Sequence, residues 1–93
     1  ERLDLHNQAE VLAYKVDEAL SKCKKELDKE EKNRIKADVA NLRRYLRKDK
    51  PEKMNETEEA NLRQAKSQLE ASANHLMVLY ASEQSENGSD NTL

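Results

Sequence analysis

Apolar side chains recur along this chain in steps of three and four residues, through three successive segments. That spacing brings them onto one face of an α-helix, whereas a half-buried strand would show strict alternation. Gly and Pro occur once each, and Trp and Phe do not occur, so the sequence lacks the residues from which β-sandwiches and barrels build their turns and strands. The sequence therefore predicts an all-α fold, an antiparallel three-helix bundle with one long N-terminal helix.

We expect three helices, at about residues 2–26, 29–48 and 53–82, with short connections that make neighbouring helices antiparallel. They should form one domain, residues 1–81, because a chain of 93 residues is enough for one small domain only. Residues 82–93 hold one apolar side chain and cannot bury enough surface to offset the entropy of ordering, so we expect a disordered C-terminal tail. The predicted core of the bundle consists of Leu5, Leu12, Val16, Leu20, Cys23, Leu27, Ile35, Val39, Leu42, Leu46, Leu62, Leu69, Leu76 and Leu79.

Two local signals mark where these helices begin. Asp28 and Glu31 have the form of a capping box, in which the Asp28 carboxylate accepts a bond from a free backbone N–H and Glu31 reaches back. Pro51 interrupts the helical pattern, because a proline inside a helix costs about 3 kcal/mol. We therefore expect the second helix to begin after Asp28 and the third to begin between Pro51 and Asn55.

The charges of the chain nearly cancel, with 17 Lys and Arg against 19 Asp and Glu. A nucleic-acid-binding domain is usually basic, so nucleic acid is not expected as a partner. The longest apolar run, Leu76 to Ala81, is far shorter than the roughly 20 residues of a membrane span, so no membrane is expected either. A single Cys forms no internal disulfide and no signal-peptide pattern opens the chain, so secretion is not evident. The chain begins within a helical pattern and without Met, which suggests a piece of a longer protein.

Few residues in the sequence carry chemistry. His6 and His75 lie on different segments and are expected to be ordinary polar residues on exposed faces, since a metal site needs clustered ligands. Cys23 occupies a position in the apolar spacing, where a free Cys behaves as a small hydrophobic residue. The only Gly, Gly88, lies in the tail, so a glycine-rich phosphate loop is not possible. We therefore expect no catalytic residue, no metal ligand and no cofactor in this chain.

Basic residues gather between Arg43 and Lys50, at the end of the second predicted helix. Cations at that end compensate the negative pole of the helix dipole, and this is the interpretation that the sequence favours. The alternative is that the basic residues bind an acidic partner.

Three stretches of the sequence resemble one family. NQAEVLAYKVDEALSK (7–22), KEEKNRIKADVANLRRYL (29–46) and QLEASANHLMVLY (68–80) are similar, in this order, to the C-terminal helical lid of DnaK-type, seventy-kilodalton heat-shock chaperones. The resemblance covers about residues 2–81, and its most specific part is the opening Asn-x-Ala-acid-x-x-x-aromatic pattern that begins at Asn7. The other two stretches share mainly helix length, capping and apolar spacing with the family.

The resemblance implies a function in protein folding and the stress response. In the family, an upstream ATPase domain binds ATP and Mg²⁺, a β-sandwich domain grips extended client polypeptides, and the helical lid closes over them and slows their release. An acidic residue on the long lid helix, one turn before an aromatic residue or His, latches the lid to a loop of the sandwich. Glu10 and Tyr14 match those positions here. This chain would itself be no enzyme and would bind no cofactor.

The family also implies partners and a location. Unfolded clients would be held by the adjacent sandwich domain, and J-domain co-chaperones and nucleotide-exchange factors would act on the full-length protein. The last residues, SDNTL, do not match the short acidic tail motif of eukaryotic cytosolic members. The resemblance therefore favours a bacterial cytoplasmic or an organellar protein.

Two other classes of protein remain open. A structural or adaptor bundle of the spectrin or coiled-coil kind would show the same apolar spacing, with another helix laid along its surface as partner. An enzyme is the least favoured class, because three slender helices leave little room for a pocket of ionisable groups. If the first helix is longer than the second, Leu3, Leu5 and Val11 lack a partner, and weak homodimers are expected through this exposed apolar surface.

Overall fold

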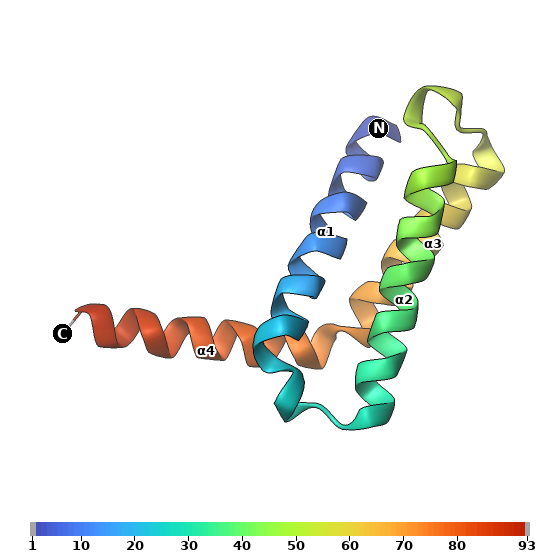
Figure 1. The fold of residues 1–93 in the computed structure, drawn as a ribbon. Helices are drawn as coiled ribbons and strands as arrows, with labels where there is room; N and C mark the ends of the chain where they lie inside the picture. Colours follow the sequence, from blue (N-terminus) through green and yellow to red (C-terminus); the bar gives the residue numbers. More distant parts are fainter. Residues whose placement is uncertain (1, 93) are drawn as a thin grey trace.

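The computed structural model describes the backbone of residues 2–92 and the side chains of residues 2–83, and every regular element in that part is helical (Figure 1). This confirms the all-α fold. Two short 3₁₀ turns, Lys24–Glu26 and Pro51–Lys53, join the first three helices. The helices in chain order are α1 (Arg2–Cys23), α2 (Lys29–Lys48), α3 (Glu56–Ser72) and α4 (Asn74–Thr92).

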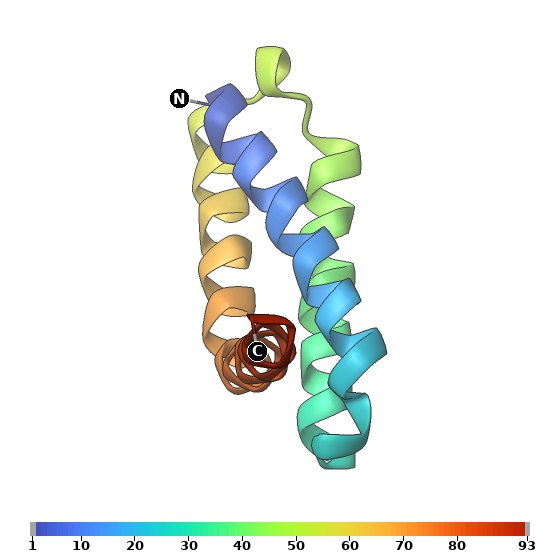
Figure 2. The ribbon, with the colours of Figure 1, turned by 90° about the vertical axis from the view of Figure 1, so that its left-hand side faces the viewer.

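The first three helices form an antiparallel bundle. The chain descends along α1, returns along α2 and descends again along α3, and α2 contacts both of its neighbours (Figure 1). α4 leaves the base of α3 at a large angle and its first turns pack against α1; Figure 2 shows it end-on. The bundle therefore has its core between α1, α2 and α3, and the start of α4 closes one end of it.

The third predicted helix, over residues 53–82, is in fact two helices that meet at Ala73. Ala73 has φ −93° and ψ 2°, outside the α-helical region, and the Ser72 hydroxyl donates to the Leu69 carbonyl at 3.4 Å. A side-chain bond of this kind competes with the helical backbone and bends it. A straight helix over residues 53–82 would be about 45 Å long, whereas α2 is about 30 Å long. Its C-terminal end would therefore project beyond the core of the bundle. The turn instead places Leu76 in the core, fully buried.

Side-chain caps begin α2 and α3. The Asp28 carboxylate accepts from the Glu31 N–H at 2.7 Å, so half of the predicted capping box is present. The Glu31 carboxylate does not reach back; it lies 2.9 Å from Nδ1 of His75 on α4. A complete capping box occurs at α3, where the Asn55 side chain accepts from the Glu58 N–H at 2.8 Å and the Glu58 side chain accepts from the Asn55 N–H at 3.0 Å.

The core contains most of the residues that the apolar spacing predicts. Leu12 and Leu79 are the exceptions: both are only partly buried and pack against the edge of the core. On α1 the centre of the buried face passes through Ala9 and Ala13, which let the neighbouring helices approach closely and leave Leu12 to one side. Met54, from the connection between α2 and α3, is also buried. The predicted core residues that the structure buries are Leu5, Val16, Leu20, Cys23, Leu27, Ile35, Val39, Leu42, Leu46, Leu62, Leu69 and Leu76.

Arg2 ties the start of α1 to the start of α3. Its Nε donates to the Glu59 carboxylate at 2.9 Å, and its Nη1 donates to the Met54 carbonyl. This contact brings the first turns of α1 into the bundle. Leu5 is buried, as the predicted core has it, so the conditional expectation that Leu5 lacks a partner is wrong. Leu3 is exposed, as expected.

Disorder is predicted for the tail, residues 82–93, but the side chains of residues 84–93 lie outside the described part of the chain. The backbone of α4 continues to Thr92, and within this segment the side chains of Ser82 and Glu83 are described. Disorder of the rest of the segment stays a prediction.

Candidate functional site

Glu10 and Tyr14 lie one turn apart on α1, and both are exposed. Tyr14 is 67% exposed, and the Glu10 side chain is 58% exposed. Val11, between them, is 51% exposed. A neighbouring domain could therefore reach the carboxylate, the phenol ring and an apolar side chain on this part of α1.

His6, one turn before Glu10, is not the exposed residue that the sequence predicts. Its side chain is buried between α1 and the end of α2, with Nε2 3.2 Å from the Leu46 carbonyl. A carbonyl only accepts, so Nε2 carries the proton and donates. Nδ1 is then directed to the other side, where it lies 3.7 Å from the Glu10 carboxylate.

A pocket of about 360 Å³ opens beside Glu10, between α1 and the C-terminal half of α2. Arg43, one of the basic residues around it, forms an ion pair with Asp17 of α1. The pocket therefore has a wall of buried side chains and a basic rim. It is lined by His6, Glu10 and Ala13 of α1, Arg43, Leu46 and Arg47 of α2, and Lys50.

A second and more apolar groove, of about 420 Å³, runs between α1 and α3. Val11 and Leu12 line it, with Lys15 on one side. Lys66 and Glu70 of α3 form the other side and pair with one another at 2.9 Å.

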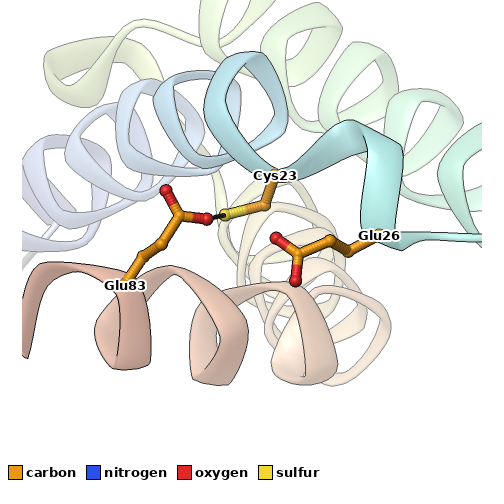
Figure 3. A group of neighbouring side chains, drawn as sticks. All are labelled: Cys23, Glu26 and Glu83. Atoms are coloured by element: carbon orange, nitrogen blue, oxygen red, sulfur yellow. Dashed lines mark hydrogen bonds between the residues drawn. The ribbon is translucent and has the colours of Figure 1, made fainter. Parts of the chain in front are cut away.

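Cys23 lies at the end of α1, where it faces α4. It is fully buried, as the sequence predicts for a small core residue, and its Sγ donates to the Glu83 carboxylate at 3.3 Å. Figure 3 shows the thiol pointing at Glu83, with Glu26 beside them. Burial, the bond to Glu83 and the two nearby carboxylates raise the pKa of the Cys23 thiol to about 11. A thiol held protonated in this way is a poor nucleophile at neutral pH.

Cys23, Glu26 and Glu83 also form a cluster of donor atoms that could hold a metal ion, and it is the one such cluster in the part of the chain that the structure describes. One donor atom from each of Cys23, Glu26 and Glu83 lies within 4.8 Å of the others. A structural zinc site usually has four ligands and needs the thiolate form, whereas here the thiol already donates to Glu83. The geometry therefore favours a hydrogen bond that fastens α4 to α1.

A second polar contact fastens α4 to the bundle. His75 Nδ1 lies 2.9 and 3.1 Å from the two oxygens of the Glu31 carboxylate on α2. The sequence offers no signal for this pair, because the partners are 44 positions apart and Glu31 also fits a local capping pattern. Together with the Cys23–Glu83 bond, it joins α4 to α1 and α2.

No protein-family model matches this chain, and no solved structure matches it. The resemblance to a chaperone lid therefore depends on the residues of the sequence itself. Among the helices that the structure describes, none combines the length and the hydropathy that a membrane crossing needs.

Proposed function

We propose that this chain is the helical lid of an ATP-dependent chaperone of the DnaK type, and that it slows the release of polypeptides bound by an adjacent β-sandwich domain. The observation that carries the proposal is the exposed position of Glu10 and Tyr14, one turn apart on the long first helix, where the family pattern has its latch. A lid works by obstruction and needs no catalytic group of its own. The Cys23 thiol is buried and its pKa is raised to about 11, so it is a poor nucleophile, which is compatible with a function that needs none.

The latch would work through the Glu10 carboxylate. A carboxylate that accepts a hydrogen bond from a charged donor forms a stronger and shorter contact than a neutral pair does. Because the Glu10 side chain is more than half exposed, the contact stays open to water and can break when the lid opens. Tyr14 adds an aromatic surface beside it. Lid opening is then a shift between two populations, which nucleotide and client bias through their different affinities for the open and closed states.

Other parts of the proposal concern the longer protein. ATP and Mg²⁺ would be bound by an upstream ATPase domain, and J-domain co-chaperones and nucleotide-exchange factors would act there. Clients would be unfolded or extended polypeptides. A bacterial cytoplasm or an organelle is the proposed location.

A chimera tests the proposal. Residues 1–93 replace the lid of a DnaK-type chaperone, and the release of a fluorescent client peptide is followed in ADP. We expect slower release than from the same chaperone without a lid. Glu10→Gln should speed release several-fold, and Glu18→Gln, a matched exposed acid two turns further along α1, should leave the rate unchanged. ATPase activity without client should be the same in all variants.

Two results would contradict the proposal. Release from the chimera as fast as from the lidless protein would remove the lid function altogether. In that case the adaptor bundle becomes the better candidate, since the apolar groove lined by Val11 and Leu12 would suit a partner helix. Equal effects of Glu10→Gln and Glu18→Gln would keep the lid but remove Glu10 from the latch.

A further inference from the structure

The basic residues around the end of α2 exceed what the helix dipole explains. Cations within the last turn of a helix, such as Arg47 and Lys48, are stabilised by the dipole, but the effect is confined to that turn. Arg43 lies more than one turn before the end of α2, and Lys50 lies beyond it. Both nevertheless line the same pocket as Arg47. Two of the three cations that line the pocket, Arg43 and Lys50, are therefore not accounted for by the dipole.

The arrangement of the cations suits a carboxylate. Arg43 and Arg47 are four residues apart on α2 and so lie on one face of the helix. Each guanidinium offers a planar fork of N–H donors that matches the two oxygens of a carboxylate. Lys50 adds a third cation at the rim. The pocket, at about 360 Å³, has room for one or two acidic side chains.

The inner wall of the pocket is apolar and fixed. Ala13 and Leu46 are both buried core residues whose exposed edges face the pocket. His6 completes this wall, and its bond to the Leu46 carbonyl holds the ring in place. A wall of this kind suits the methylene groups of Asp and Glu side chains, while the basic rim suits their carboxylates. A bare inorganic anion would use only the rim.

The pocket already contains one acidic group of the chain itself. Glu10 lies at the rim, 3.7 Å from His6, and Asp17 pairs with Arg43. Glu10 therefore shares the pocket lining with Arg43, Arg47 and Lys50, and part of the Arg43 charge is neutralised by Asp17. Because the Glu10 side chain is 58% exposed and lines the same pocket, it would compete with an incoming carboxylate for these cations.

We propose that this pocket binds an acidic segment of a partner polypeptide, with two or more Asp or Glu residues. The charge of the pocket is local: the chain carries −2 overall, and acids on α1 border the basic rim. A nucleic acid would need a continuous basic track, which these bordering acids interrupt. A short acidic segment needs only the pocket. The inference is independent of the lid function, because binding takes place within this chain.

The test uses the 93-residue chain and a fluorescein-labelled peptide with six Glu residues separated by Gly. Binding is measured by fluorescence anisotropy in low salt, with a Gln-for-Glu peptide of the same length as the peptide control. We expect the Glu peptide to bind, the Gln peptide to bind at least tenfold more weakly, and added salt to weaken the complex through screening of the exposed charges.

Two double variants with the same change in net charge separate the pocket from general attraction. Arg47→Gln/Lys50→Gln removes two cations that line the pocket, and Arg44→Gln/Lys48→Gln removes two neighbours that do not. The first should weaken binding of the Glu peptide at least tenfold, which corresponds to about 1.4 kcal/mol, and the second less than threefold. Glu10→Gln should strengthen binding, because it removes the competing acid. Circular dichroism checks that all variants remain helical.

Several outcomes would overturn the proposal. They are the absence of binding at millimolar peptide, equal binding of the Glu and Gln peptides, or equal losses in the two double variants. Inorganic phosphate or a single-stranded oligonucleotide that binds more tightly than the peptide, with the same dependence on Arg47 and Lys50, would replace the acidic polypeptide as the ligand. Weaker binding by Glu10→Gln would show that the peptide does not enter the pocket.

Discussion

Leu42 and Leu12 have the same side chain and the same place in the apolar spacing, but the structure gives them different surroundings. Leu42 lies on α2 between its two neighbouring helices and is fully buried, whereas Leu12 lies at the edge of the core beside the groove between α1 and α3. Replacing each with Ala therefore measures whether the three helices pack as described.

The size of each effect follows from burial. A fully buried Leu→Ala change costs about 2–5 kcal/mol, because it removes apolar contacts and leaves a cavity. We expect about 3 kcal/mol for Leu42→Ala, a large part of the roughly 5–14 kcal/mol that a domain of this size has in total. At about 4–8 °C per kcal/mol, Tm should fall by about 12–24 °C. Leu12→Ala borders an open groove and leaves no closed cavity, so about 1 kcal/mol is expected.

Urea denaturation followed by far-ultraviolet circular dichroism measures both variants. The midpoint should shift strongly for Leu42→Ala and weakly for Leu12→Ala, with the slope of free energy against urea unchanged in both. Leu3→Ala, at an exposed position, serves as the control and should have almost no effect. Equal losses for Leu42→Ala and Leu12→Ala would refute the packing of α1 described here.

Three further predictions concern single contacts. The bonds from Arg2 and Arg63 hold the pKa of the Glu59 carboxyl below its usual 4.5. A carboxyl whose folded pKa is lowered stabilises the fold above its unfolded pKa and loses that effect as pH falls through the folded value. The free energy of unfolding is measured at pH 7 and below pH 4. Arg2→Ala should lose less stability on acidification than the parent does. An unchanged loss would show that the bond from Arg2 does not lower the pKa of Glu59. Cys23 should react with iodoacetamide slowly at pH 7.5 and rapidly in urea; rapid labelling of the folded chain would contradict its burial and its raised pKa of about 11. Sedimentation at millimolar protein should show a weak dimer that forms through the exposed apolar side chains of α1 and that Leu3→Glu/Val11→Glu abolishes. A strict monomer would exclude self-association through these side chains.

Much of the fold could be predicted because it depends on local period. α2 occupies the range that the apolar spacing and the Asp28 cap indicate, and α1 begins where predicted but ends at Cys23, three residues before the predicted end. The turn at Ala73 could not be predicted in this way, because the spacing continues through Leu69, Ala73 and Leu76 without interruption. Two helices joined by such a turn can share one uninterrupted apolar spacing, so the spacing does not reveal the turn. The local signals at Ser72 and Asn74 are too common to mark a break by themselves.

The candidate site shows the same division. Glu10 and Tyr14 are singled out by the family resemblance alone, and the structure adds that both are exposed. The burial of His6 could not be predicted, since it depends on the Leu46 carbonyl, 40 positions away. The basic residues near the end of α2 were visible in the sequence, but only the packing of α1 against α2 separates Arg47, which lines the pocket, from Arg44, which does not. Glu83 was assigned to the tail because composition alone cannot reveal a single bond to Cys23.

The proposed latch requires a contact between Glu10 and a cation of the neighbouring sandwich loop, and a double-mutant cycle on client release measures that contact directly. In the chimera, Glu10→Lys and an exchange of the facing loop Lys or Arg for Glu should each speed release several-fold. Both changes together should restore slow release, because the opposite charges face one another again. If the two effects simply add, Glu10 does not face that cation, and the latch is contradicted.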